Sequence, residues 1–222
     1  MKKIGVRLGN WLTAEQPQRL WQAPGGERLK EKRDRALLAV LLACGLRRHE
    51  AVELNLGHIQ QREEHWAIVD LKGKAGHTRT IPMPGWVKNV VDQWIQAANI
   101  TSGKLFRRVH KMGKTWGEKL TEKAVWHVVR QHAVKADIHK LAPHDLRRTC
   151  ARLCYAAGGE LEQIQFLLGH VSIQTTNDIS VANSGFKLLC MTRSALSLLT
   201  ETPKSDLPTI CPQPLLLSGS QQ

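Results

Sequence analysis

Cysteine is scarce in this sequence of 222 residues, and no apolar run reaches the length needed to cross a membrane. The five cysteines are odd in number and form no Cys-x-x-Cys pair. Cys150 and Cys154 lie one helical turn apart, a spacing that suits a metal ion, but we favour small core residues because that is the commoner use of such thiols. Free thiols and the absence of a signal peptide predict a protein of the reducing cytoplasm.

Acidic residues are also few: 19 Asp and Glu stand against 32 Lys and Arg, a formal net charge of +13. Residues 177–222 contain three basic and three acidic residues, so residues 1–176 carry the whole excess. A positive excess favours a polyanionic partner, because each neutralised phosphate releases condensed counterions. The sequence therefore predicts a nucleic-acid-binding body joined, near residue 177, to a segment of a different kind.

Hydrophobic periodicity and breaking residues predict a mainly α fold with a small antiparallel β-sheet near its middle. Residues 13–16 resemble a capping box with Thr13 as the cap and Gln16 at the third helical position, so a short helix should run to about Trp21. Strands are expected at 66–71 and 79–82, joined by a glycine-bearing turn, with a small hairpin within 105–120. The remaining helices are expected at 29–44, 48–54, 84–98, 121–136, 143–157 and 161–168.

The pattern divides the chain into three parts. Residues 1–12 are an N-terminal remnant, residues 13–176 are the folded domain, and residues 177–222 are an aberrant tail. Four prolines after residue 200 interrupt a tail of Ser, Thr and scattered Leu that has no amphipathic period. We therefore expect poor order in the tail.

Three short segments carry the candidate functional residues. Residues 44–50 read Cys-Gly-Leu-Arg-Arg-His-Glu, and residues 73–82 read Gly-Lys-Ala-Gly-His-Thr-Arg-Thr-Ile-Pro. Residues 143–149 read Pro-His-Asp-Leu-Arg-Arg-Thr, and Leu-Leu-Gly-His follows at 167–170. Each segment alone is ambiguous, because an arginine after a helix-ending glycine is usually a carbonyl cap, a turn lysine is usually just exposed, and His-x-x-Arg is commonplace.

Taken together, the order and spacing of these segments resemble the catalytic domain of the tyrosine recombinases, the phage-integrase family. Members carry an arginine, a lysine in a β-hairpin, a His-x-x-Arg pair, a histidine or tryptophan after Leu-Gly and, last, the tyrosine nucleophile. The resemblance covers residues 37–176. It implies the tyrosine recombinase catalytic-domain fold and assigns five residues to the site: Arg47, Lys74, His144, Arg147 and His170.

The resemblance implies site-specific recombination or integration of double-stranded DNA, in which a tyrosine attacks a phosphodiester and forms a 3′-phosphotyrosyl intermediate. Arg47 and Arg147 would clamp the phosphate, since a guanidinium binds two oxygens and stays charged, and His170 would donate to the same oxygens. Lys74 would protonate the departing 5′ oxygen, and His144 would act as a base or orienting partner. The covalent intermediate stores the bond energy, so neither a metal nor a cofactor is implied.

The resemblance also gives Glu50 a supporting role in orienting the active-site helix, although the plainer interpretation of this residue is a buried ion pair with an arginine. Basic residues that flank the motifs are expected to contact DNA: Arg48, Lys72, Arg79 and Arg148.

The nucleophile is missing from this pattern. Family members place it nine residues after the Leu-Gly-His histidine, which is Ile179 here, and the single tyrosine, Tyr155, stands where the family has packing residues. Residues 177–186 can be back-translated with allowed codons. When a G precedes these codons and the reading frame starts one base earlier, they encode Glu-Arg-Tyr-Leu-Gly-Cys-Lys-Gln-Arg-Phe. The tyrosine then falls at position 179, where the family has its nucleophile. We therefore hypothesise a one-base deletion near the Thr176 codon, which sequencing of the gene would test.

A second departure lies at the front of the chain, where the 12 residues before Thr13 are too few for the helical domain with which family members clamp the far side of the DNA. Intact relatives form tetramers through a C-terminal segment that is altered here, so we expect assembly to be impaired in this chain. Three interpretations follow: a recombinase by descent that is truncated and inactive, a DNA-binding remnant without chemistry, and an unrelated basic helical protein such as an RNA-binding factor. The last leaves the ordered set of motifs unexplained.

Overall fold

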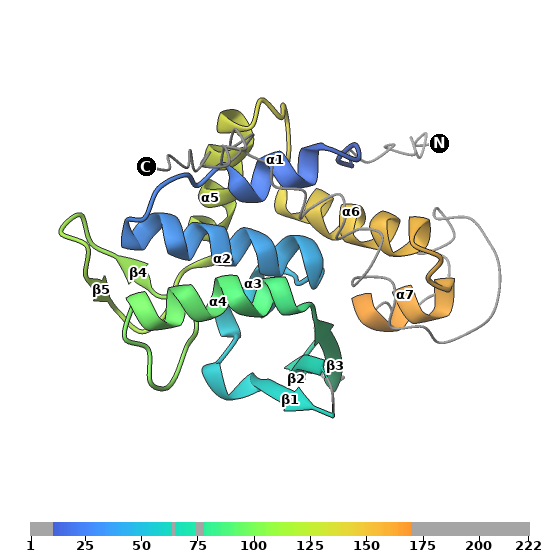
Figure 1. The fold of residues 1–222 in the computed structure, drawn as a ribbon, viewed down its shortest axis with the longest axis horizontal. Coiled ribbons are helices and arrows are strands. Elements are labelled where there is room, and N and C mark those ends of the chain that lie inside the picture. Colours follow the sequence, from blue (N-terminus) through green and yellow to red (C-terminus); the bar gives the residue numbers. More distant parts are fainter. Residues whose placement is uncertain (1–10, 64, 74–77, 170–222) are drawn as a thin grey trace, which may run out of the picture.

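Helix α2 (Leu29–Ala43) lies at the centre of the computed structural model, which describes residues 11–63, 65–73 and 78–169. Residues 37–42 of this helix are all at most 1% exposed. A helix that is apolar on every side must be enclosed by other elements. Helices α1 (Gln16–Gln22), α4 (Gly85–Ala97) and α6 (Pro143–Ala156) all pack against α2 (Figure 1).

Helix α1 begins two residues later than expected, so the prediction of Thr13 as its cap is wrong. The residue before the helix is Glu15, and the Gln16 side chain reaches back to accept a hydrogen bond from the Thr13 backbone N–H at 3.0 Å. Pro17 explains the late start. Proline has no N–H and its ring clashes with the carbonyl four residues earlier, so it is tolerated in the first turn of a helix and not deeper.

The other α-helices of the described residues confirm the predicted ranges to within a residue at each end. At α5 (Glu122–Lys135), the Thr121 hydroxyl accepts a hydrogen bond from the Ala124 N–H at 3.2 Å and caps the helix. At α6, the Asp145 carboxylate accepts one from the Ala142 N–H at 2.9 Å, and Pro143 is the first helical residue. The helices not yet named are α3 (Arg48–Glu53), α7 (Leu161–Leu168) and the 3-10 turn η1 (Leu56–His58), which was not predicted.

A three-stranded antiparallel sheet lies beside α4, in the strand order β1-β2-β3 (Figure 1). Strands β2 (His65–Lys72) and β3 (Thr78–Met83) confirm the predicted pair, and a register shift between Ile68 and Leu71 surrounds Asp70, whose φ is +54°. Strand β1 (Ile59–Arg62) was not predicted, because it is short, polar and partly exposed and so shows no alternation. The fold is therefore mainly α with a small antiparallel sheet, as expected.

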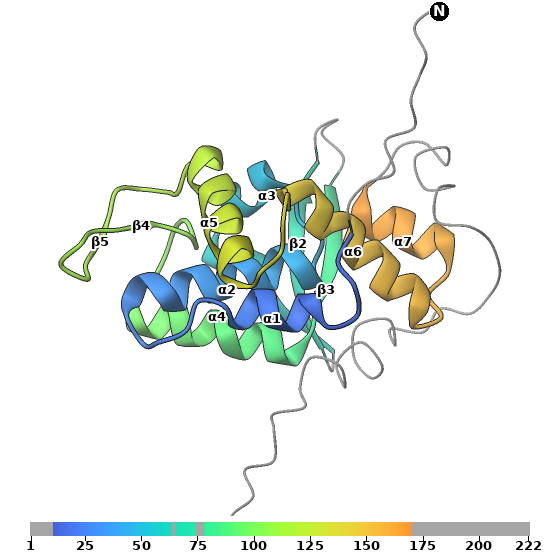
Figure 2. The ribbon, with the colours of Figure 1, turned by 90° about the horizontal axis from the view of Figure 1, so that it is seen from above.

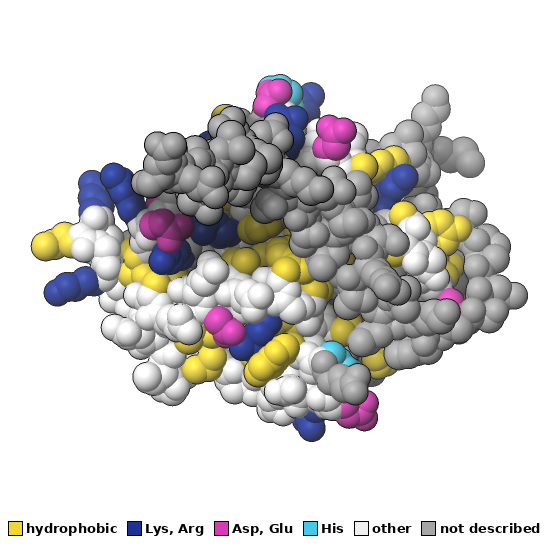
Figure 3. Space-filling view, in the orientation of Figure 1, with side chains coloured by type: hydrophobic (Ala, Val, Ile, Leu, Met, Phe, Trp, Pro, Cys, Tyr) yellow, Lys and Arg dark blue, Asp and Glu magenta, His cyan; other side chains and the backbone are white. Residues whose placement is uncertain are grey.

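The small hairpin of β4 (Arg108–Val109) and β5 (Thr115–Trp116) lies at the opposite end of the molecule from α6 and α7 (Figure 2). Figure 3 shows lysine and arginine side chains gathered at this hairpin end. Lys111 and Lys114 in its turn are exposed, and neither pairs with a carboxylate of the described residues. The end of the domain that carries the hairpin is therefore strongly basic.

A second, smaller apolar cluster joins α6 to α7. Cys150 and Cys154 are both buried in it, together with Ile164 and Leu168 from α7. The prediction that the two thiols are core residues is confirmed. Leu12 is also buried, and its N–H donates to the Thr149 hydroxyl at 3.0 Å, so the chain is already part of the packed body at this residue. Within the described ranges, no helix has the length and hydropathy of a membrane span.

Candidate active site

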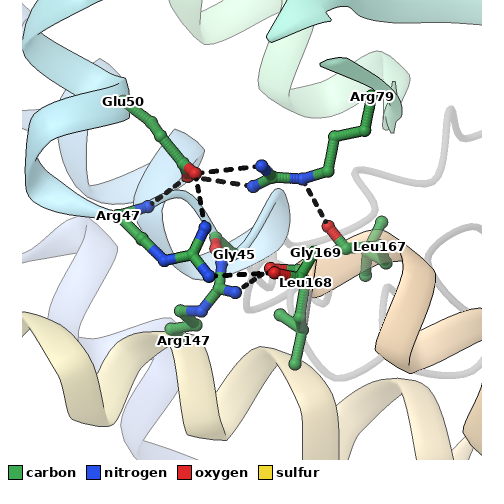
Figure 4. A network of polar contacts seen from close by, with 8 residues as sticks. All are labelled: Gly45, Arg47, Glu50, Arg79, Arg147, Leu167, Leu168 and Gly169. Carbon is green, nitrogen blue, oxygen red and sulfur yellow. Dashed lines mark hydrogen bonds and ion pairs between the residues drawn. The ribbon is translucent and has the colours of Figure 1, made fainter. Parts of the chain in front are cut away.

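Arg47 and Arg147, one hundred residues apart in the chain, both direct their guanidinium groups at the C-terminal end of α7 (Figure 4). Arg147 Nη1 donates to the Gly45 carbonyl at 2.6 Å, and its Nη2 donates to the Leu168 carbonyl. Arg47 Nη2 donates to the next carbonyl, that of Gly169, at 3.1 Å. The structure therefore brings together the two arginines that the sequence assigned to a phosphate clamp.

A third guanidinium, that of Arg79 on β3, reaches the same helix end and donates from Nε to the Leu167 carbonyl at 3.0 Å. Three consecutive carbonyls at the end of α7 thus accept hydrogen bonds from three different arginines (Figure 4). The last carbonyls of a helix have no partner within the helix and carry partial negative charge, so cations satisfy them. The end of α7 is the common anchor of the site.

Glu50 is the one carboxylate that pairs with these arginines among the described residues, and it is 3% exposed. Its Oε1 accepts from Arg47 Nη1 at 2.7 Å and from Arg79 Nη1 at 2.9 Å. Its Oε2 accepts from the Arg47 backbone N–H at 2.7 Å and from Arg79 Nη2 at 2.9 Å. The buried ion pair expected for Glu50 is confirmed, and its partners are two arginines at once.

The surroundings of Glu50 act on its pKa in opposite directions. Burial raises the pKa, but the hydrogen bonds and charges of Arg79 and Arg47 outweigh burial and hold it below its usual value. Burial lowers the pKa of Arg147 to about 10, and the positive charge of Arg47 acts in the same direction. Arg147 therefore stays charged at neutral pH. Among the described residues, the three guanidiniums lie near one carboxylate, that of Glu50, which pairs directly with Arg47 and Arg79, so these four side chains carry a net charge of +2.

The two clamp arginines differ in their access to solvent. Arg147 is 2% exposed, whereas the Arg47 side chain is 32% exposed. His144, on the first turn of α6, is exposed. Partial desolvation lowers the pKa of His144, and so do the charges of Arg148, Arg147 and Arg47. His144 is therefore neutral at pH 7 and able to accept a proton beside the two arginines.

The remaining predicted residues divide into three groups. Arg48, Lys72 and Arg148 are exposed, as a DNA contact requires. Arg79 is not, because its side chain is 5% exposed and bonded to Glu50 and α7. Lys74, His170 and Ile179 lie outside the described residues.

The inward position of Arg79 was missed by the sequence reasoning, although a signal for it was present. Side chains alternate along a strand, and in β3 Arg79 shares the buried face with Ile81, while Thr78 and Thr80 are exposed. An arginine on the same buried face as an isoleucine needs an anion in the interior to compensate its charge, and Glu50 is that anion.

A mainly helical domain with a three-stranded sheet at its edge and paired arginines at a helix end has the fold of a tyrosine recombinase catalytic domain. The chain belongs to the phage integrase family, whose sequence profile matches residues 10–182. The chain is 33% identical over 192 residues to tyrosine recombinase XerD of Proteus mirabilis, and 32% identical over 182 residues to that of Vibrio cholerae. These alignments cover 84% and 78% of this chain but only 60% and 57% of the two relatives.

Solved structures share the fold. The crystal structure of XerA recombinase superposes with a TM-score of 0.63 at 23% identity, over 79% of this chain and 61% of that one. The XerH site-specific recombinase, solved as a pre-cleavage complex with its difH substrate, gives a TM-score of 0.65 at 20% identity, over 79% of this chain and 51% of that one. The chain therefore spans between half and two thirds of the length of the recombinases that it resembles.

Proposed function

We propose that this chain derives from a site-specific DNA recombinase and that, as written, it binds double-stranded DNA without cleaving it. The observation that carries the proposal is the pair of guanidiniums, Arg47 and Arg147, that meet at the end of α7 with a net positive charge around them. A phosphodiester oxygen needs this kind of partner, because a guanidinium forms charge-assisted hydrogen bonds and keeps its charge.

The remaining site residues keep the positions of the family pattern, and their roles apply to a chain that carries the tyrosine. In such a chain His144, neutral beside the arginines, would accept or orient the proton of the nucleophile. Lys74 would protonate the departing 5′ oxygen, and His170 would donate to the phosphate. Arg48, Lys72 and Arg148 contact the DNA backbone around the site, which fixes the position of the duplex.

The missing nucleophile is the reason why this proposal includes DNA binding but excludes DNA cleavage. In family members a tyrosine attacks the phosphorus and forms a 3′-phosphotyrosyl bond while the 5′ oxygen leaves as a hydroxyl. Ile179 occupies the position nine residues after His170 and has no nucleophilic atom. The chain can therefore stabilise a phosphate but cannot form the covalent intermediate.

A nicked duplex that traps covalent protein tests both halves of the proposal. We expect a gel shift of the duplex without a covalent adduct. A second chain, in which the tail from residue 177 is replaced by the segment read in the shifted frame, places tyrosine at 179 and should form the adduct. Absence of any DNA binding by the original chain would overturn the proposal, and an adduct formed by the original chain would overturn its inactive state.

A second candidate function is that of a non-catalytic binding module that occupies recombination sites and competes with intact relatives. The missing tyrosine favours it. Mixing the chain with an active relative should then reduce strand exchange in proportion to the DNA that the chain occupies. If the chain binds duplex DNA but leaves strand exchange by the relative unchanged, the module function is wrong and only the recombinase descent stands.

A further inference from the structure

We propose that Arg79 is a positioning residue that keeps the Arg47 guanidinium available for a phosphate by holding Glu50 in place. This inference rests on the proposed function, because it concerns how the site presents Arg47 to DNA. It differs from the sequence-based expectation that Arg79 itself contacts DNA.

All three guanidinium nitrogens of Arg79 donate hydrogen bonds to acceptors inside the protein. Nη1 and Nη2 each donate to a different oxygen of Glu50 at 2.9 Å, and Nε donates to the Leu167 carbonyl at 3.0 Å. The side chains of Arg79 and Glu50 are 5% and 2% exposed. A bidentate pair removed from water in this way has little freedom to rotate.

Gly169 gives independent support for this placement. The residue ends α7 with φ at +57°, and a Cβ there would lie 3.1 Å from Arg79 Nη1 and 3.2 Å from Arg79 Cδ. A glycine therefore suits both the left-handed conformation, which other residues rarely adopt, and the close passage of the arginine. Arg79 thus connects β3, α3 and the end of α7 at one point.

The sharing of Glu50 explains why Arg79 matters for Arg47. Glu50 Oε1 accepts from both Arg47 Nη1 and Arg79 Nη1, so Arg47 makes only one side-chain hydrogen bond to this carboxylate. Without Arg79, the carboxylate is free to turn onto Arg47 and to neutralise it with both oxygens. The net charge of the site would also fall from +2 to +1. Both effects weaken the attraction of Arg47 for a phosphate.

A double-mutant cycle on DNA binding tests this inference, with the full chain and a duplex at low salt. Arg47→Ala should weaken binding about tenfold in the wild-type chain, as loss of a charge-assisted phosphate contact does, and less than about threefold in an Arg79→Met chain. The matched control is Arg48→Ala, an exposed neighbour with no contact to Glu50 among the described residues. It should lower affinity by the same factor in both chains. A purely structural defect would reduce the effects of both substitutions together.

Arg79→Lys provides a second variant in case Arg79→Met fails to fold, which thermal unfolding reports. A lysine keeps the charge beside Glu50 but cannot donate to both oxygens and to Leu167, so Arg47→Ala should have an intermediate effect in that chain. Equal effects of Arg47→Ala in wild-type and Arg79→Lys chains would overturn the positioning role while leaving the proposed function intact. If Arg47→Ala does not weaken binding in the wild-type chain, the assignment of Arg47 to the phosphate is wrong and this inference fails with it, whereas absence of DNA binding by the wild-type chain would overturn the proposed function itself.

Discussion

Replacement of Glu50 by glutamine provides the most direct test of the electrostatics of the site. The substitution keeps the size of the side chain but removes its charge and turns an NH₂ group toward buried guanidiniums. Glu50 accepts four hydrogen bonds, two of them from Arg79, whose side chain is 5% exposed. An amide has a single acceptor oxygen and cannot replace both carboxylate oxygens.

The expected loss follows from these contacts. Removal of one partner of a buried ion pair typically costs about 3–5 kcal/mol, because the other charge is left in the interior without compensation. Arg147 adds to the loss, since its guanidinium is buried beside the same carboxylate and close to Arg47. We therefore expect Glu50→Gln to lower the free energy of unfolding by about 3–5 kcal/mol, a large part of the stability of an ordinary domain.

Urea unfolding followed by tryptophan fluorescence measures this difference, because Trp94 is fully buried and reports the core. The pH dependence gives a second readout. The pKa of Glu50 lies below its ordinary value of 4.5 in the folded protein, so its stabilising effect is complete above that value and is lost as the pH falls through the folded pKa. The difference between wild type and Glu50→Gln should therefore be constant near neutral pH and shrink in acid.

Glu53→Gln is the matched control, three residues along the same helix. The Glu53 side chain is 34% exposed and pairs with Lys104 and Lys119, whose hydrogen bonds lower its pKa to about 2. Because this pair is open to solvent, we expect a loss of about 1 kcal/mol or less, which salt near 1 M should abolish. If the free energy of unfolding of Glu50→Gln lies within about 1 kcal/mol of the wild-type value, and the denaturant slope is unchanged, our account of the buried ion pair is wrong.

Three further predictions concern other parts of the domain. A bound phosphate should raise the pKa of His144, so DNA binding takes up a proton. As the pH is lowered from about 8 to about 5.5, DNA affinity should therefore rise more steeply in wild type than in His144→Asn. Equal slopes of the two proteins at constant ionic strength would contradict this prediction. Asp34→Ala should cost about 3–5 kcal/mol in chemical denaturation, because Asp34 is the carboxylate that pairs with buried Arg33 among the described residues, and DNA affinity below the melting temperature should not change. Gly169→Ala should lower the melting temperature through about 1–3 kcal/mol of backbone strain and through contact with Arg79, and a melting temperature equal to that of wild type would refute the close approach.

Local signals along the chain were sufficient for most of the helices. Thr121 and Pro143 mark helix starts, and Gly45 and Gly169, both with positive φ, mark helix ends. These signals act within one helical turn, so they can be recognised without knowledge of the rest of the fold. Strand β1 escaped prediction because its pairing with β2 is decided by backbone hydrogen bonds between segments, and its own polar side chains give no alternation.

The sequence by itself determined the family, through the order and spacing of its motifs, and the absence of a tyrosine at position 179. It also determined the basic character of residues 1–176, because charge is a sum over residues and does not depend on how they fold. The tertiary structure alone decided which arginines meet. Arg47, Arg79 and Arg147 come from three separate elements and converge on the end of α7 only because α3, β3 and α6 all pack against the same core. The tertiary structure likewise decided that Arg79 faces inward. The pairing of β3 with β2 determines which face of the strand is buried, and Glu50 supplies the charge that makes the burial of Arg79 favourable.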